Sequence, residues 1–302
     1  MSRAGAPARV LVVGDVMTDI ICRPEGPVLL GSDRRAKILS RPGGSGANQA
    51  VWLAACGLAV RFAARVAAAD RDAFASRFAA LGVEAAFAAD PVLPSGTLVT
   101  LVSPDGERSF LTDRGANLAL ASADLPDALL EGTRRLVVSG YSLFEPSPRA
   151  AVTGLMARAA ARGIETLVDA ASSGFLQEIG AENFFAWTTG SDTLFANADE
   201  AAALTGGTSL EAQMQFLAER YRRVVIKLGG LGAALLRRGS RPLSLPAPAV
   251  TIVDSTGAGD AFAAAFIAAE LAGNADEACL RAAISAGAEA VQHVGGQPVP
   301  AG

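Results

Sequence analysis

The sequence has few of the residues that build disulfides and metal centres. Its 302 residues include three Cys and one His. Cys22, Cys56 and Cys279 lie too far apart for a disulfide framework or a metal knuckle, which is typical of a protein from a reducing compartment. The single histidine, His293, cannot build a zinc site, and no spacing favours a Ser-His-Asp group.

Long apolar segments and strong positive charge are also missing. No apolar run reaches a membrane-spanning length without a charge or a glycine, and residues 1–9 lack the apolar centre of a signal peptide. We therefore expect a cytoplasmic protein that does not enter a membrane. The net charge is −4 and the arginines are scattered, which argues against nucleic acid as a partner.

Two common nucleotide-binding motifs are absent as well. The sequence contains no Gly-x-x-x-x-Gly-Lys-Ser/Thr run, which excludes a P-loop kinase. No Gly-x-Gly-x-x-Gly follows the first apolar run at residues 9–14, which disfavours a dinucleotide-dependent dehydrogenase.

What is present is a regular alternation of apolar runs and amphipathic segments. Hydrophobic residues make up 51% of the chain, enough for a sizeable core. The alternation predicts an α/β fold with a mostly parallel sheet and helices on both of its faces. We expect one domain over residues 1–302. The expected strands cover 9–14, 60–66, 83–87, 135–139, 164–169, 193–196, 224–227 and 233–236. The expected helices cover 47–55, 70–81, 147–162, 211–221, 257–272 and 275–293.

A hairpin interrupts this alternation. The β-branched runs 97–102 and 108–112 flank the turn-forming segment 103–107, and a further short strand is expected over 36–40. Two-stranded pieces inserted early in an α/β chain indicate a small accessory sheet.

The stretch from Val253 to Phe262 carries the clearest chemistry. An apolar β-branched run, 250–253, precedes Asp-Ser-Thr-Gly-Ala-Gly-Asp and an Ala-rich apolar segment, which predicts a strand end, a glycine turn and a helix start. The N–H groups of a helix's first turn form an anion site. Asp260 falls in that turn, where a carboxylate can accept a proton from a hydroxyl that attacks the anion's phosphorus. The simpler interpretation is a helix N-terminus with an acidic first-turn residue.

A glycine-rich loop and two carboxylates lie near the start of the chain. Three glycines within residues 43–46 let a backbone lie flat against a ligand, although a flexible connector has the same composition. Asn48 follows early in a helix and offers both a donor and an acceptor to a hydroxylated compound. Asp15 and Asp19 follow the first strand, where open α/β sheets place ligands, although Asp15 alone also fits a turn.

The stretch 254–262 and the loop 43–48 together resemble the two signatures of the PfkB (ribokinase-like) family of carbohydrate kinases. The resemblance implies a ribokinase-like fold with a β-sheet lid, drawn from about 16–42 and 96–114, that covers the sugar and can form a homodimer interface. Many members have Lys where this chain has Ser45. The implied substrate-binding residues are Asp19, Gly43, Gly44, Asn48, Arg114 and Asn117, although the segment 113–117 also fits a plain turn.

The resemblance also implies a site for ATP. Glu200, in an Asn-x-x-Glu element, would hold Mg²⁺ through water. Asn197 and Glu200 could also cap a short helix, which is compatible with that role. Lys227 could reach a phosphate or be an exposed lysine at a strand end. Asp254 matches a K⁺ ligand of some members, but Val299 stands where a Ser often contributes. The implied ATP-binding residues are Asn197, Lys227, Gly229, Gly232, Thr256, Gly257 and Gly259.

The sequence therefore predicts an ATP-dependent kinase that phosphorylates a hydroxyl of a sugar or sugar derivative. Asp260 would act as the base, and the N–H groups of Gly257, Ala258 and Gly259 would stabilise the transferring phosphoryl group. Two alternatives remain: a nucleoside kinase of the same family, and a sugar-binding regulator that has lost catalysis.

Overall fold

The computed structural model describes residues 9–103, 108–207 and 209–298 of the chain. The tip of the predicted hairpin, residues 104–107, and Val299 lie outside the described residues. None of the helices in the described ranges is both long and apolar enough to cross a membrane.

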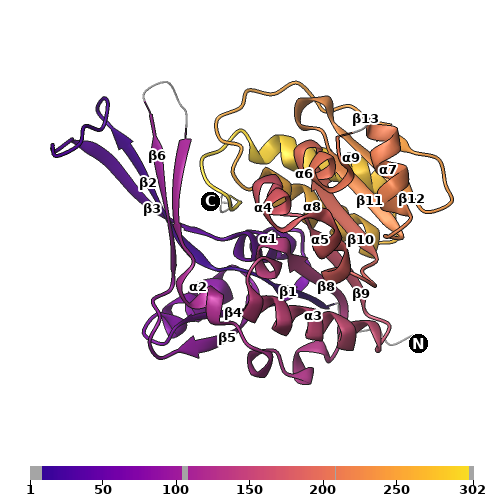
Figure 1. Ribbon diagram of the computed structural model, residues 1–302, viewed down its shortest axis with the longest axis horizontal. Coiled ribbons are helices and arrows are strands. Elements are labelled where there is room, and N and C mark those ends of the chain that lie inside the picture. The colour runs from indigo at the N-terminus through magenta and orange to yellow at the C-terminus, as the bar shows by residue number, and fades with distance from the viewer. Residues whose placement is uncertain (1–8, 104–107, 208, 299–302) are drawn as a thin grey trace.

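Nine strands of the described chain form one large sheet in the order β13-β12-β11-β10-β9-β8-β1-β4-β5 (Figure 1). The pairings from β5 through β11 are parallel, and β12 and β13 pair antiparallel at one edge. The mostly parallel sheet predicted from the sequence is confirmed. Its strands are β1 (Arg9–Val13), β4 (Ala59–Ala67), β5 (Val83–Asp90), β8 (Thr133–Ser139), β9 (Glu165–Asp169), β10 (Thr193–Asn197), β11 (Arg223–Lys227), β12 (Ala233–Arg237) and β13 (Leu243–Leu245).

Helices cover both faces of this sheet and enclose two hydrophobic cores. One face carries α3 (Pro146–Ala160), α4 (Ser173–Ile179), α5 (Ala181–Trp187), α6 (Ala198–Thr205) and α7 (Leu210–Ala218). The other face carries α1 (Ser45–Ala55), α2 (Arg71–Ala80), α8 (Ala258–Leu271) and α9 (Asp276–Ala290).

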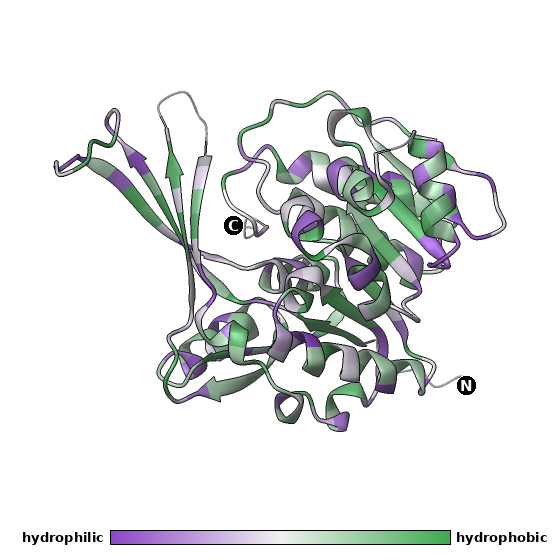
Figure 2. Ribbon diagram, in the orientation of Figure 1, coloured by the Kyte–Doolittle hydropathy of each residue, from purple (hydrophilic) through white to green (hydrophobic). Residues whose placement is uncertain are grey.

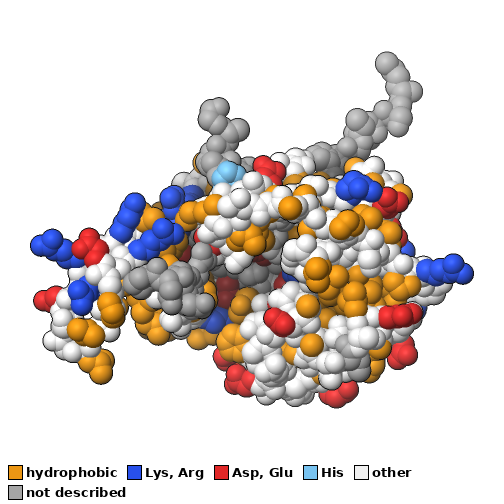
Figure 3. Space-filling view, turned by 90° about the horizontal axis from the view of Figure 1, so that it is seen from above, with side chains coloured by type: hydrophobic (Ala, Val, Ile, Leu, Met, Phe, Trp, Pro, Cys, Tyr) orange, Lys and Arg blue, Asp and Glu red, His pale blue; other side chains and the backbone are white. Residues whose placement is uncertain are grey.

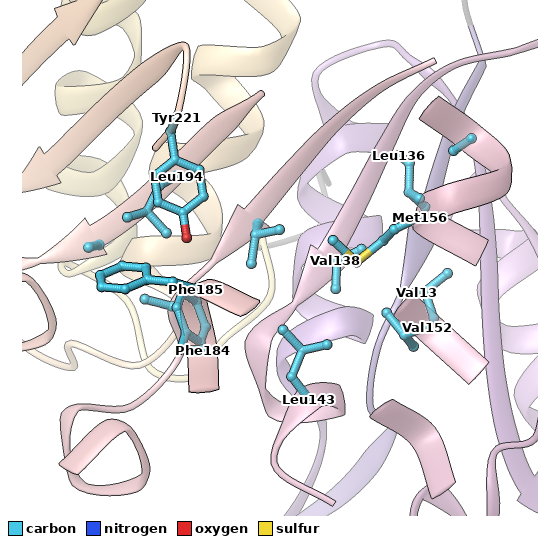
Figure 4. Close-up of a cluster of buried hydrophobic side chains, with 14 of the residues drawn as sticks. Val13, Leu136, Val138, Leu143, Val152, Met156, Phe184, Phe185, Leu194 and Tyr221 are labelled. Carbon is cyan, nitrogen blue, oxygen red and sulfur yellow. The ribbon is translucent and has the colours of Figure 1, made fainter. Parts of the chain in front are cut away.

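The strands supply both cores because successive side chains point to opposite faces of a sheet. In β1, Leu11 and Val13 enter the core of the α3 side, whereas Val10 and Val12 enter the core of the α8 side. Figure 4 shows the first of these cores, where Val13 and Val138 lie beside side chains of α3. A strand buried on both faces reads as a continuous apolar run, and the strands of the large sheet are accordingly the greenest part of Figure 2.

A separate four-stranded sheet projects from one end of the molecule (Figure 1). It contains the predicted hairpin, and its strand order is β3-β2-β6-β7. The pair β2–β6 is parallel, whereas the two outer pairs are antiparallel. The strands are β2 (Met17–Pro24), β3 (Ala36–Gly43), β6 (Gly96–Val102) and β7 (Arg108–Asp113).

The expected strand over 250–253 does not form. These residues have no strand partner, and the Ile252 and Val253 side chains are largely exposed. The backbone N–H groups of Val253 and Asp254 both donate to the carbonyl of Val291, just after α9. The β-branched composition predicted a strand, and this prediction is wrong because the segment is hydrogen-bonded to the end of a helix and not to a sheet.

Candidate active site

The turn before α8 is held by a loop from near the C-terminal end of the described chain. Asp254 Oδ1 accepts from the N–H of Thr256 at 2.8 Å, and Asp254 Oδ2 accepts from the N–H of Gly295 at 3.1 Å. Gly257 precedes α8 with φ +76°, and a Cβ placed on it would lie 2.3 Å from the carbonyl oxygen of Gly296. Trp52 Nε1, from α1, donates to that same oxygen at 2.9 Å. The glycine turn is thus fixed from two sides.

Asp260 lies in the first turn of α8, where α1 meets it. Ser45 Oγ donates to Asp260 Oδ1 at 3.3 Å. Burial raises the pKa of Asp260 to about 7, and the charge of Asp169 adds to the increase. The Lys227 ammonium and the side chain of Asn48 favour the charged form and limit the shift. A carboxyl group with this pKa can exchange a proton near neutral pH.

Lys227 ends β11 and points into the site. Its Nζ donates to Asp169 Oδ2 at 2.9 Å, and a Cβ placed on Gly259 would lie 3.2 Å from the same Nζ. The ammonium therefore lies beside the glycine turn, and the expectation of an exposed lysine is wrong because its side chain is 15% exposed. Burial alone would lower the pKa of Lys227, but the carboxylates of Asp169 and Glu200 outweigh burial and raise it.

Asp169 was not among the residues predicted for the site. The only signal in the sequence is that the strand over 164–169 ends in a carboxylate. Because β9 and β11 both border β10, the parallel topology brings Asp169 and Lys227 together at the same edge of the sheet.

Asn197 and Glu200 form a complete capping box at the start of α6. The N–H and the Nδ2 of Asn197 donate to the two carboxylate oxygens of Glu200, each at 2.8 Å. Burial, and then the charge of Asp169, raise the pKa of Glu200 to about 7. The side chain of Asn197 therefore supports this carboxylate, and its contact with a nucleotide stays a prediction.

The glycine loop before α1 is shaped by contacts within the chain. A Cβ on Gly43 would lie 2.1 Å from Asp19 Oδ2, and a Cβ on Gly44, where φ is +92°, would lie 2.5 Å from the carbonyl oxygen of Asp15. Contacts within the chain therefore require these glycines, and their approach to a ligand stays a prediction. They let the loop approach Asp19, whose burial raises its pKa to about 6.

Arg114 and Asn117, which are predicted as substrate contacts, form polar contacts within the chain. Arg114 binds both carboxylate oxygens of Asp15 at 2.9 Å and the carbonyl of Tyr141 at 3.0 Å. Asn117 accepts from the N–H of Val16 and donates to the carbonyls of Val16 and Arg114. Their polar atoms fasten the loop after β7 to the end of β1, and Asp15 is an ion-pair partner and not a plain turn residue.

Two cavities border the segment 254–259. The first, of about 370 Å³, lies between α8, α9 and the segment 247–252. It is lined by Lys227, Gly229, Gly230, Gly232, Ala247, Pro248, Ala249, Val250, Ile252, Ser255, Ala258, Gly259, Phe262, Ile284, Gly287, Ala288 and Val291. The second lies between the small sheet and the loops 254–256 and 294–296, and Asp19, Asp254 and Thr256 line it. The segment 254–259 thus borders both cavities.

A family model of the pfkB family carbohydrate kinases matches residues 7–301. The chain belongs to this family. It is 33% identical over 281 residues to the bifunctional protein HldE of Azotobacter vinelandii, with 87% of this chain and 56% of that protein covered. It is 31% identical over 213 residues to ribokinase of Arabidopsis thaliana, with 68% of this chain and 54% of that protein covered. The chain therefore spans about half the length of these curated relatives.

The ribokinase-like fold is confirmed by solved structures. The structure of Arabidopsis thaliana ribokinase complexed with ribose and ATP superimposes with a TM-score of 0.77 at 26% identity. The match covers 96% of this pfkB family chain and 94% of that chain.

Proposed function

We propose that this pfkB family chain transfers the γ-phosphoryl group of ATP to a hydroxyl of a sugar or a nucleoside. One observation carries the proposal: the segment 254–259 borders both cavities, and Asp260 follows it directly. ATP in the first cavity and a hydroxyl compound in the second would meet at this turn. The apolar walls of the first cavity, including Phe262 and Ile284, suit an adenine.

The residues around the turn fit the separate tasks of phosphoryl transfer. Asp260 accepts the proton of the attacking hydroxyl. The N–H groups in the first turn of α8, including that of Gly259, would face the phosphoryl group, and the N–H of Ala258 also donates to the carbonyl of Ser255 at 3.4 Å. The ammonium of Lys227, beside Gly259, neutralises phosphate charge. Gly257 and Thr256 shape the turn. Gly229 and Gly232 both line the first cavity, where ATP would bind.

The carboxylates of Asp169 and Glu200 fit Mg²⁺, which keeps most of its water and takes few protein ligands. Their mutual repulsion contributes to the raised pKa of Glu200, and a cation between them would relieve it. Within the described residues, no group of three or more His, Cys, Asp or Glu could hold a metal by itself. Bound there, Mg²⁺ would neutralise charge on the ATP phosphates. Asp254, which joins the loops 254–256 and 294–296, remains our candidate for K⁺.

The second cavity, lined by Asp19, and the start of α1, which carries Asn48, offer acceptors for a compound rich in hydroxyl groups. Asp19 Oδ1 and Asn48 Oδ1 are buried acceptors without a partner among the described residues. Hydroxyl donors of a sugar would satisfy such acceptors, which otherwise cost about 1–3 kcal/mol each. The regulator interpretation is disfavoured because a regulator needs neither Asp260 nor the ammonium of Lys227 at the turn.

A nucleoside remains the second candidate substrate because of Phe110. This ring borders the second cavity and is 58% exposed, so it could stack on a base. The small sheet would act as the lid over either substrate. Its outer face exposes Ile38 and Leu111, and we propose that a second copy of the chain covers this face.

The experiment that tests the proposed function is ATP turnover with Mg²⁺, with and without K⁺, against sugars, sugar phosphates, sugar acids and nucleosides. Turnover of a sugar-type or nucleoside compound is the expected result, and the compound assigns the substrate class. If folded protein that still binds ATP phosphorylates none of these compounds, the proposal is contradicted.

The pH dependence of turnover should follow the ionisation of Asp260. Only the ionised carboxylate can accept a proton, and the pKa of this group is raised to about 7. We therefore expect kcat to rise roughly tenfold per pH unit below that pKa and to level off above it. The measurement is kcat between pH 5.5 and 9 at saturating ATP and substrate. A flat profile down to pH 5.5 would speak against Asp260 as the base.

A further inference from the structure

The small sheet carries positive charge in a protein that is negative as a whole. Residues 17–43, which form β2, β3 and their connection, contain five Lys or Arg and three Asp or Glu, whereas the whole chain has a net charge of −4. In Figure 3, several Lys and Arg side chains gather at the end of the molecule that carries this sheet. Two of the five, Arg23 and Arg41, line the second cavity.

The strand register places two of these arginines on the face that borders the cavity. Arg41 pairs directly with Asp19 across β2 and β3, and Arg23 lies four residues beyond Asp19 on the same face of β2. Both arginines line the cavity together with Asp19 and Thr256. The face that would close over a substrate therefore presents two guanidinium groups.

Neither guanidinium is neutralised by the protein. Arg23 and Arg41 have no ion-pair or side-chain hydrogen-bond partner within the described residues, and both are exposed. Two less exposed arginines differ: Arg114 is paired with Asp15, and Arg65 is paired with Asp90. Asp19 faces Arg41 in the register, yet its carboxylate packs against Gly43 and forms no ion pair with Arg41.

Closure of the sheet over a neutral compound would bury two cationic groups without a partner, which is unfavourable. An oxyanion on the compound would instead receive charge-assisted hydrogen bonds from a planar guanidinium. Because Arg23 lies roughly 13 Å from Asp19 along the strand, its side chain can reach only the far part of a compound whose hydroxyls bind Asp19.

We propose that the substrate of this site carries an anionic group, a phosphate or a carboxylate, remote from the hydroxyl that reacts, and that Arg41 and Arg23 bind this group. The inference rests on the proposed function and narrows its substrate class. Arg41, which stands level with Asp19, is the primary contact, and Arg23 is the second.

The first test compares matched pairs of compounds that differ only in charge. The pairs are ribose with ribose 5-phosphate, fructose with fructose 6-phosphate, and glucose with gluconate and glucose 6-phosphate. We expect at least one anionic compound to exceed its neutral partner in kcat/KM by about 10- to 100-fold. The phosphates and the carboxylate form separate arms, so the result also identifies the oxyanion. Binding of every compound is measured by calorimetry with a non-hydrolysable ATP analogue.

The second test uses Arg41→Gln and Arg23→Gln, with Lys37→Gln as the matched control. Lys37 pairs with Arg23 in the register and is exposed, but it does not line the cavity. We expect Arg41→Gln to remove most of the preference for the anion, measured as the ratio of kcat/KM for the anionic compound to kcat/KM for its neutral partner. Lys37→Gln should retain the preference, and raised salt should weaken only binding of the anion.

Two outcomes would overturn the inference. One is equal or better use and binding of the neutral partners throughout the panel. The other is a preference for anions that survives both arginine substitutions. Failure of the proposed function has a different signature, because anions would then still bind more tightly than their neutral partners while none of the compounds is phosphorylated.

Discussion

Asp260→Asn should lower kcat about 100- to 10,000-fold, the range that loss of a general base produces. The amide has the shape of the carboxylate but cannot accept the proton of the attacking hydroxyl. The turn itself should persist, because Gly257 and Asp254 fix it independently of Asp260. Steady-state turnover measures the loss, and calorimetry with a non-hydrolysable ATP analogue checks that the nucleotide still binds.

Protein stability separates this loss from misfolding. Burial raises the pKa of Asp260 from 3.8 to about 7, so the charged carboxylate opposes folding at pH 8, and this cost shrinks steadily as the pH falls from about 7 to about 3.8. The Asn variant should therefore melt no lower than the unmodified protein at pH 8. Asp72→Asn is the matched control, because this side chain is 89% exposed at the start of α2 and should leave kcat unchanged. Turnover of Asp260→Asn at the rate of the control would refute the assignment of the base.

Gly257→Ala should lower kcat by about 100-fold or more, comparable to loss of a donor from an anion hole. The new methyl group would lie 2.3 Å from the carbonyl oxygen of Gly296, so either the turn or the loop 294–296 must move. Either movement displaces the N–H groups that face the phosphoryl group. Turnover is compared with ATP binding, because the affinity for ground-state ATP should fall less than kcat.

Gly273→Ala is the control at the other end of α8. Gly273 has φ +82°, close to the +76° of Gly257, but nothing lies within 4 Å of a Cβ placed there. Both variants should lose about 1–2 kcal/mol of stability from the left-handed backbone. Only Gly257→Ala should lose kcat. A similar loss in the two variants would mean that general destabilisation, and not the turn, limits the reaction.

The fold could be predicted because the local sequence pattern marks most of its strands and helices. The strands of the large sheet are buried on both faces and read as apolar runs, and glycines mark the ends of several helices. The short helices α4 and α5 and the full length of β2 were not predicted, because packing and strand pairing set their limits more than local composition does.

The site was harder to predict because its decisive contacts join distant residues. Arg114 and Asp15 are 99 positions apart, and Lys227 and Asp169 are 58 positions apart. Sequence reasoning placed both Arg114 and Lys227 near the site but could not assign their partners. A resemblance between motifs predicts where a residue lies in the fold. The role of that residue also depends on which polar group it contacts in the folded chain.

The contact between Gly296 and the glycine turn has a consequence for the timing of synthesis. The loop 294–296 leaves the ribosome about 40 residues after Asp254, yet it holds Asp254, Gly257 and Trp52 in place. A chain made only as far as α9 can already assemble the large sheet and most of both cores. It would still lack the support of the glycine turn, so the proposed phosphoryl transfer could begin only after the loop 294–296 has been made.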